Sequence, residues 1–220
     1  MNDAPVASRA PAAAAAPRAR CRVVVMAKAP LPGLAKTRLI PALGADGAAR
    51  LARRMLDHAL HQALAAGVGA VELCATPDAA HAAFDAWRTL PLRWSDQGGG
   101  DLGQRMHHAI ERALGEARTA LLIGTDAPAL DAAVLRAAAG ALDDHDAVFV
   151  PALDGGYALI GVRRAAATLL LGGVAWSTSR VMAVTRERLH AHGWRYAELG
   201  PVADIDEPAD LRHLPPHWRT

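Results

Sequence analysis

The chain has 220 residues, of which 52% are hydrophobic and only 4% aromatic, and its formal net charge is +2. Three arginines lie in the first twenty residues against a single acid, so the rest of the chain carries equal numbers of basic and acidic residues. A neutral body argues against nucleic-acid binding, which depends on many phosphate contacts. We expect a disordered Ala/Pro/Arg-rich tail over residues 1–20 and one domain over residues 21–220.

The two cysteines, Cys21 and Cys74, fall in expected buried strands and lack the paired spacing of a metal site or a disulfide scaffold. No window approaches the length and apolarity of a transmembrane span. The first twenty residues lack both the basic start and the apolar core of a secretory signal. We therefore expect a cytoplasmic protein with no membrane segment.

Short apolar strands alternate with helical patterns along the chain. Strands are expected at residues 23–27, 71–75, 92–94, 119–124, 147–150, 158–162 and 194–199, and helices at residues 47–66, 78–87, 102–114, 132–142 and up to about residue 192. Near-continuous apolar strands in alternation with helices are typical of a mainly parallel sheet covered on both faces. The predicted fold is an α/β domain with three layers, α/β/α, and a Rossmann-like sheet.

The loop after the first strand is rich in proline, glycine and cations. Lys28 ends the apolar run, Gly33 follows two prolines, and Lys36, Thr37 and Arg38 precede the first long helix. A strand that runs through such a loop into a helix places backbone N–H groups and a helix N-terminus at one edge of the sheet. The three cations make a phosphate chain the predicted ligand. The alternative is a plain connection with solvated lysines.

Carboxylates follow the strands at two further places. Asp126 comes directly after the clearest strand, at the edge where open α/β sheets bind ligands. Asp204 and Asp206 are two apart, so an extended backbone points both to one side and Ile205 to the other. Mg²⁺ (or Mn²⁺) suits such a set, because magnesium takes one or two protein carboxylates together with substrate phosphates. The alternatives are a turn-forming Asp126 and a helix capped by Asp206 or Glu207.

Asp154, Gly155, Gly156 and Tyr157 combine a carboxylate, two residues without side chains and a phenol. Glycines let a ligand approach the backbone closely, and a tight hairpin turn uses the same residues. Asp154 is the candidate for a base on the acceptor side.

A second glycine motif suggests a different kind of site, one for a dinucleotide. Gly98, Gly100 and Gly103 match G-x-G-x-x-G, and Asp126 lies at roughly the 20-residue spacing of a dinucleotide fingerprint. The strand before it is short and polar, however, whereas a dinucleotide fold places the fingerprint after its first strand. Asp101 and Gln104 also form a capping box for the next helix. NAD(P) binding through this loop is the weaker alternative.

Six motifs, taken in order, resemble those of one bacterial family of GT-A-fold proteins related to 2-phospholactate guanylyltransferase. Many of its members are labelled glycosyltransferases, some of them in arsenosugar biosynthesis. The motifs are MAKAP at 26–30 with GLAKTRL at 33–39, GDLG at 100–103, GTDAP at 124–128, DGGY at 154–157, WST at 176–178 and DID at 204–206. The resemblance covers about residues 21–215.

The resemblance implies a GT-A (nucleotide-diphospho-sugar transferase) fold and a Mg²⁺-dependent transferase that uses a nucleotide or nucleotide-sugar donor and a small-molecule acceptor. It implies Asp126 as the main metal ligand, with Asp204 or Asp206 as the second. The predicted donor- and substrate-binding residues are Lys28, Gly33, Lys36, Thr37, Arg38, Gly100, Asp101, Gly155, Gly156 and Tyr157, and the predicted catalytic residues are Lys36, Asp126 and Asp154. A nucleotide-binding protein of the same fold without catalysis is the alternative function.

Overall fold

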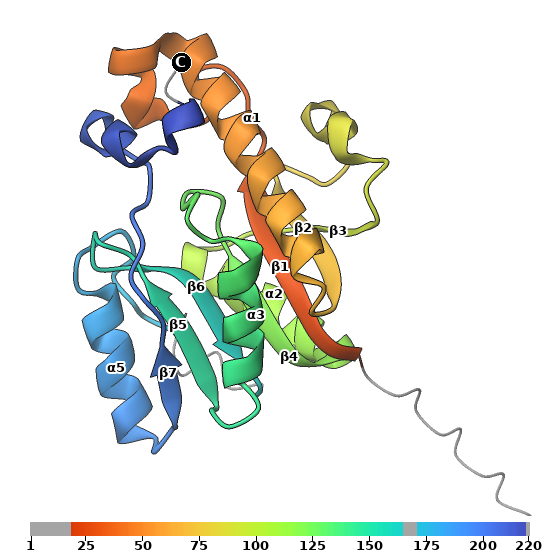
Figure 1. The fold of residues 1–220 in the computed structure, drawn as a ribbon, viewed down its shortest axis with the longest axis vertical. Coiled ribbons are helices and arrows are strands. Elements are labelled where there is room, and N and C mark those ends of the chain that lie inside the picture. The colour runs from red at the N-terminus through yellow and green to blue at the C-terminus, as the bar shows by residue number, and fades with distance from the viewer. Residues whose placement is uncertain (1–18, 165–170, 219–220) are drawn as a thin grey trace, which may run out of the picture.

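A computed structural model describes residues 19–164 and 171–218. Strands and helices alternate through most of this part of the chain (Figure 1). The elements are, in order, β1 (Ala19–Lys28), η1 (Thr37–Leu39), α1 (Ile40–Ala66), β2 (Ala70–Thr76), η2 (Ala82–Trp87), β3 (Leu92–Asp96), α2 (Leu102–Glu116), β4 (Ala117–Ile123), α3 (Ala132–Ala141), β5 (Ala147–Pro151), β6 (Tyr157–Val162), α5 (Val181–Ala191), β7 (Tyr196–Glu198), η3 (Pro208–His213) and η4 (Pro216–Trp218).

The strands form one seven-stranded sheet in the order β3-β2-β1-β4-β6-β5-β7. β1 pairs in parallel with β2 and β4, and the pairs β2–β3 and β5–β7 are parallel as well. Among the strands of the described ranges, only β6 runs against its neighbours, β4 and β5. The prediction of a mainly parallel α/β sheet is therefore confirmed.

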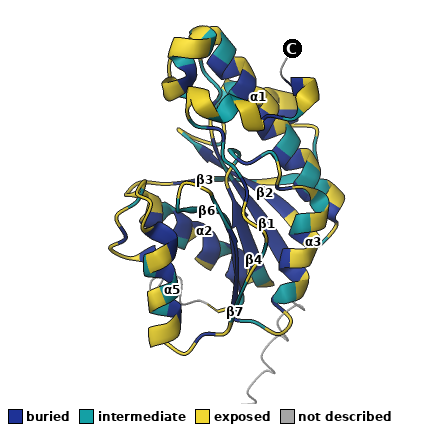
Figure 2. Ribbon diagram, turned by 60° about the vertical axis from the view of Figure 1, so that its left-hand side comes forward, coloured by how far each residue is buried: buried dark blue, intermediate teal, exposed yellow. Residues whose placement is uncertain are grey.

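Helices cover both faces of the sheet because successive strand residues point to opposite sides. Val23 and Val25 of β1 join a buried cluster with residues of α1 and α3. Val24, between them, joins the opposite cluster with residues of α2 and α5. Figure 2 shows the central strands buried, while the helices expose their outer sides. The predicted three layers are thus present.

A third buried cluster brings the last segment of the chain against the start of α1. Leu39 and Met55 pack there with Ile205, Leu214 and Trp218. Figure 1 shows the C-terminal elements beside the first turns of α1. This packing holds the segment around residue 205 next to the loop around residue 36, although the two are far apart in sequence.

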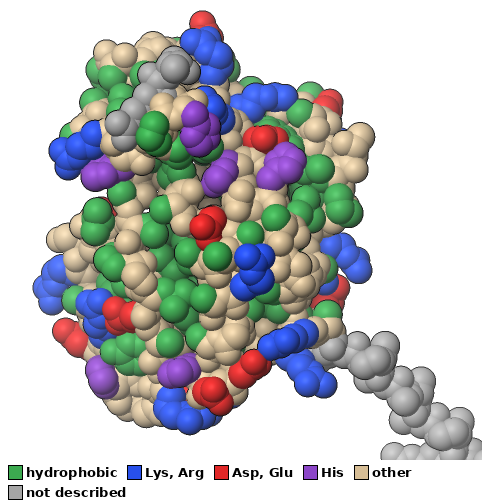
Figure 3. All heavy atoms as spheres, viewed as in Figure 1, with side chains coloured by type: hydrophobic (Ala, Val, Ile, Leu, Met, Phe, Trp, Pro, Cys, Tyr) green, Lys and Arg blue, Asp and Glu red, His purple; other side chains and the backbone are tan. Residues whose placement is uncertain are grey.

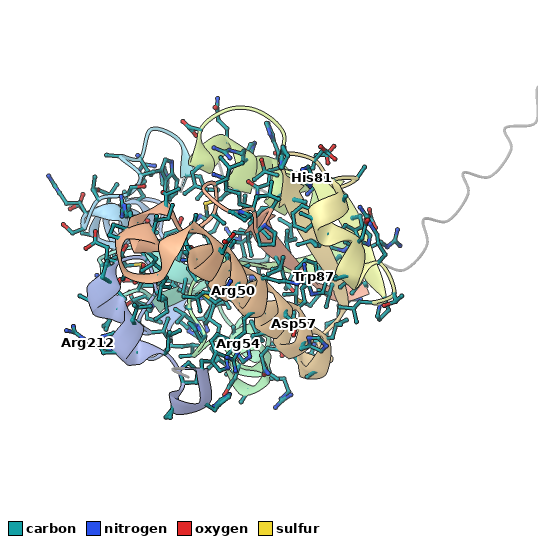
Figure 4. The ribbon with its side chains drawn as sticks, turned by 90° about the horizontal axis from the view of Figure 1, so that it is seen from above. Arg50, Arg54, Asp57, His81, Trp87 and Arg212 are labelled. Carbon is teal, nitrogen blue, oxygen red and sulfur yellow. The ribbon has the colours of Figure 1, made fainter. Side chains whose placement is uncertain are left out.

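The helix predicted for residues 78–87 is wrong in type, since this region folds as the 3₁₀ helix η2. Phe84 and Trp87 are both buried and stand three residues apart, which matches the three-residue turn of a 3₁₀ helix. Trp87 fastens η2 to α1, because its indole Nε1 donates to Asp57 Oδ1 at 3.0 Å. Figure 4 shows Trp87 beside Asp57 on α1.

Most of the predicted N-terminal tail lies outside the described residues. β1 begins at Ala19, two residues before the predicted start of the domain, and Arg20 contacts Asp143 with Nη2 at 2.9 Å from Oδ2. On the face shown in Figure 3, basic and acidic side chains are interspersed. Within the described ranges, no helix has the length and apolarity needed to cross a membrane.

Candidate active site

A cavity of about 530 Å³ lies at one edge of the sheet. The carboxyl ends of β1 and β4 meet there with the amino end of β6, which reaches the same edge because it runs antiparallel. Its lining includes Lys28 together with residues of the segments 34–38, 124–127, 152–158, 176–178 and 204–206. Leu102 of the GDLG motif lines it as well, so parts of all six sequence motifs border one space.

Lys36 is the most closely held cation of this cavity. Its backbone is left-handed, with φ 48° and ψ 46°, at the start of η1. Its side chain is only 7% exposed, and Nζ lies 2.7 Å from Asp126 Oδ1 and 3.1 Å from Asp206 Oδ1. Nζ also donates to the carbonyl oxygen of Ile205 at 2.5 Å. Nζ thus donates two hydrogen bonds, to Ile205 and Asp206, and forms ion pairs with Asp126 and Asp206.

The position of Asp126 is fixed by the end of β4 and by the C-terminal segment. β4 stops at Ile123, and the carbonyl oxygen of Asp126 accepts from the backbone N–H of Ile205 at 2.8 Å. Thr125 Oγ1 donates to Asp126 Oδ1 at 3.2 Å. The Asp126 side chain stays about half exposed, at 48%, toward the cavity. Asp126 therefore stands in a bend just before the turn at residues 127–130, with its carboxylate available to the cavity.

The Asp204–Asp206 segment has the predicted alternation. Ile205 is fully buried, while Asp204 and Asp206 both line the cavity. Glu207 is the N-terminal cap residue of η3, and its N–H donates to Asp210 Oδ2 at 2.7 Å. The helix cap thus falls on Glu207, which leaves Asp206 for Lys36 and for Arg38, whose Nη1 lies 3.6 Å from Asp206 Oδ2.

Burial raises the pKa of the Asp204 carboxyl, and the neighbouring charges of Asp154 and then of Asp206 and Asp210 raise it further. The cavity therefore concentrates negative charge on this side. An added cation would relieve the repulsion among these carboxylates.

We expect Asp204→Asn to raise the melting temperature at pH 7. The folded state binds the Asp204 proton more readily than the unfolded chain does. The cost of ionising Asp204 therefore builds up as the pH rises from the ordinary pKa of Asp to the raised one, and it is complete above the raised pKa. Asn cannot ionise, and the gain should shrink toward pH 4, where the carboxyl is increasingly protonated in both states. Melting curves of both proteins at the two pH values test this. An equal difference at both, or a lower melting temperature of the variant at pH 7, would contradict it.

The Asp154–Tyr157 segment forms the hairpin between β5 and β6. Ala152 N–H donates to the carbonyl oxygen of Gly156 at 3.0 Å, and Asp154 Oδ1 accepts from Gly156 N–H at 2.8 Å. Gly155 has φ 92° and lies against Ser179, whose carbonyl oxygen would stand 2.2 Å from an added Cβ. The hairpin reading therefore holds, and Asp154, Gly156 and Tyr157 border the cavity as well.

Four predicted binding residues do not line the cavity: Gly33, Gly100, Asp101 and Gly155. Asp101 instead caps α2, since its Oδ1 accepts from Gln104 N–H at 2.8 Å while Gln104 Oε1 accepts from Asp101 N–H at 2.9 Å. The glycine loop follows β3, which lies at one edge of the sheet and is the third strand along the chain. Its place thus differs from that of a dinucleotide fingerprint.

Sequence reasoning missed the apolar wall of the cavity. Met26, Leu122 and Ile160 lie on the face of the sheet covered by α2, where Met106 and Trp176 complete the wall. The pairing of Leu122 with Ile160 across β4 and β6 sets part of this surface. Strand alternation places Met26 with Val24 on this face, and the hairpin turn at residues 154–157 indicates that β6 runs against β5, but the pairing of β6 with β4 was not predicted.

Gln97 was also missed. Its buried amide Nε2 donates to the carbonyl oxygens of Ala27 and Cys74, each at 3.1 Å, and so joins the ends of β1 and β2 beside the cavity. It stood in a loop where a buried glutamine is not expected.

The sheet order, the mixed direction of β6 and the cavity at the strand ends define the nucleotide-diphospho-sugar transferase fold of GT-A type. The chain belongs to the family described as "Uncharacterized protein conserved in bacteria (DUF2064)", which matches residues 55–178. A comparison with curated proteins found no match.

A solved structure from Desulfovibrio desulfuricans G20, provisionally assigned as a nucleotide-diphospho-sugar transferase, is 31% identical over 88% of this chain and 85% of its own, with a TM-score of 0.81. CMP:2-keto-3-deoxy-manno-octonic acid synthetase in complex with CTP is 14% identical over 88% and 96%, with a TM-score of 0.58. Rv0371c from Mycobacterium tuberculosis in complex with manganese is 18% identical over 89% and 97%, with a TM-score of 0.55. At the two lower identities the likeness concerns the fold.

Proposed function

We propose that this protein is a divalent-cation-dependent transferase that uses a nucleotide or nucleotide-sugar donor and a small-molecule acceptor. The observation that carries the proposal is the meeting of Lys36 with Asp126 and Asp206 in one cavity, with Nζ–Oδ1 distances of 2.7 and 3.1 Å. The loop after β1, the end of β4 and the segment before η3 supply these groups at the carboxyl edge of the sheet. Ligands of open α/β sheets bind at this edge.

The side chains present fit Mg²⁺ or Mn²⁺. Asp126 and Asp206 offer carboxylate oxygens that are about half exposed, and Asp204 and Asp154 add negative charge at the same cavity. Across the described residues, no group of three or more His, Cys, Asp or Glu side chains is placed to hold a metal alone. Magnesium commonly needs only one or two carboxylates, because substrate phosphates and water complete its shell. A metal bound together with the donor phosphates suits this donor set.

The cations of the cavity would bind the phosphates of the donor. Lys28 and Arg38 line it, and the Arg38 side chain is 62% exposed, with Nη1 3.6 Å from Asp206 Oδ2 and 3.8 Å from Glu207 Oε1. The bound cation would supply further stabilisation of the charge that develops on the phosphates. Asp154, which lines the same cavity, is our candidate for the base that takes the proton of the acceptor hydroxyl.

Two kinds of donor suit this arrangement. With a nucleoside triphosphate, the acceptor oxygen attacks the α-phosphorus and pyrophosphate leaves. With a nucleotide sugar, the acceptor oxygen attacks the anomeric carbon and a nucleoside diphosphate leaves. Both leaving groups contain a diphosphate, whose negative charge the same cations would stabilise. The sequence motifs resemble those of proteins related to 2-phospholactate guanylyltransferase and of glycosyltransferases of arsenosugar biosynthesis, and so represent both kinds.

A thermal-shift panel tests the proposal. ATP, GTP, CTP, UTP, UDP-glucose, GDP-mannose, NAD and NADP are each added with and without Mg²⁺. At a ligand concentration about 100-fold above Kd, we expect stabilisation of about 2.7 kcal/mol, or roughly 5–10 °C for a chain of this size, by a donor only when Mg²⁺ is present.

Two outcomes would contradict the proposal. Equal stabilisation with and without Mg²⁺ would favour a nucleotide-binding protein without catalysis. A shift produced only by NAD or NADP would favour the glycine loop after β3 as a dinucleotide site.

A further inference from the structure

The positive charge of Lys36 is already balanced by carboxylates of the protein itself. Its ammonium group meets Asp126 Oδ1, Asp206 Oδ1 and the Ile205 carbonyl oxygen at 2.7, 3.1 and 2.5 Å. Two of the three ammonium donors thus form hydrogen bonds within the protein, and the carboxylates of Asp126 and Asp206 balance the charge. A phosphate that takes up this charge must draw the ammonium away from these carboxylates.

The contacts of Lys36 are also those that a divalent cation needs. Hard cations bind carboxylate and carbonyl oxygens, and the two carboxylates that touch Nζ open to the cavity with 48% and 44% of their side chains exposed. A divalent cation on the same two carboxylates would stand a few ångströms from a buried ammonium. Repulsion between such charges is strong where solvent is largely excluded.

We propose that Lys36 is a resident counter-ion that competes with the divalent cation for Asp126 and Asp206, and that its release couples cation binding to binding of the donor. The inference rests on the proposed function and deepens it. The cation takes over the two carboxylates as the ammonium turns to the phosphates of the incoming donor. Lys36 thus leaves the carboxylate oxygens for phosphate oxygens, and its positive charge stays balanced throughout.

The geometry supports a turn of this side chain toward the cavity. Thr37 and Arg38, the next two residues, both line the cavity, so the loop already faces the ligand space. Cation and donor each lower the cost of binding the other, and by linkage this coupling is reciprocal. The cation alone should therefore bind weakly.

Titration with Mn²⁺ in the absence of nucleotide tests the exchange, with free Mn²⁺ followed by electron paramagnetic resonance. We expect Lys36→Met and Lys36→Gln to bind Mn²⁺ about tenfold more tightly than the wild type, because each removes the competing charge. Lys28→Met is the matched control. It also removes a cavity lysine, but that lysine has no hydrogen bond or ion pair to a carboxylate among the described residues, and its Mn²⁺ affinity should change less than about twofold.

A second measurement tests the coupling. With GTP, CTP or UDP-glucose, the shift in melting temperature of the wild type with Mn²⁺ and nucleotide together should exceed the sum of the separate shifts. The two Lys36 variants should lose this excess, although each binds Mn²⁺ alone more tightly. Circular dichroism checks that they are folded, and Gln at position 36 retains a hydrogen-bond donor for the carboxylates.

Three outcomes would overturn the inference. Unchanged or weaker Mn²⁺ affinity in both Lys36 variants would show that the lysine organises the carboxylates and does not compete for them, and the proposed function would then stand on its own panel. An equal gain in Lys28→Met would show a general effect of cavity charge. Absence of Mn²⁺ binding to every protein, with and without nucleotide, would overturn both the inference and the metal dependence of the proposed function.

Discussion

Asp126→Asn is expected to abolish the Mg²⁺-dependent stabilisation by the donor. It should also lower the rate at which the protein turns over this donor by about a hundredfold or more. The substitution keeps the shape of the side chain and an oxygen for Thr125 and Lys36, so the loop after β4 should retain its course. What it removes is the negative charge that a divalent cation needs. Release of pyrophosphate or of nucleoside diphosphate from the donor found in the thermal-shift panel measures the loss.

Asp131→Asn is the matched control for this variant. Asp131 follows five residues later and caps α3, with Oδ1 accepting from Val134 N–H at 2.8 Å. Asn and Asp are about equally good at this position of a helix, so stability should hardly change. Its turnover should stay at the wild-type level. If Asp126→Asn also retained wild-type turnover and Mg²⁺ dependence, Asp126 would have no part in the chemistry.

The meeting of distant residues at the cavity could be expected from the sequence because each follows a strand. Asp126 comes after β4, and Lys28 ends β1, which is the parallel neighbour of β4. Parallel strands bring their carboxyl ends to the same edge. The position of Asp206 depends instead on Ile205, whose buried side chain packs with Leu39. The sequence predicts the alternation of cavity-facing and buried residues around Ile205, but it does not predict that Ile205 packs with Leu39.

The direction of Lys36 could not be expected. A lysine in a loop rich in proline and glycine is normally solvated, and a phosphate was its predicted partner. Its left-handed backbone turns the side chain inward, onto Asp126 and Asp206. No residue type in the loop encodes this conformation, which glycine favours and lysine rarely adopts. The exchange inferred above therefore depends on the structure alone.

Glu72, in the sheet, is a second residue whose partners could not be predicted from the sequence. Residues 71–75 read as a continuous apolar strand apart from this glutamate, and β2 is indeed buried, with only 2% of Glu72 exposed. Its partners come from other elements: Arg22 of β1, Ser95 of β3 and Arg112 of α2. Such a network needs the strand order, which patterning within one strand does not specify.

Replacement of Glu72 by Ala is expected to lower the free energy of unfolding by about 3–5 kcal/mol. Glu72 Oε2 accepts from Arg22 Nη1 at 3.2 Å, and Oε1 accepts from Arg112 Nη2 and Ser95 Oγ, each at 2.6 Å. The variant leaves the Arg22 guanidinium, whose side chain is only 5% exposed, with Glu116 as its remaining carboxylate. Urea unfolding followed by circular dichroism measures the change.

Two further variants show whether the uncompensated charge is the cause. Glu198→Ala breaks a more exposed pair with Arg186, whose two contacts are both 2.7 Å, and should cost about 1 kcal/mol or less. Arg22→Met combined with Glu72→Met removes both buried charges, while Arg112, one third exposed, can turn to water. This double variant should therefore be more stable than Glu72→Ala. If it were less stable, the ion pair itself, and not the stranded arginine, would account for the loss.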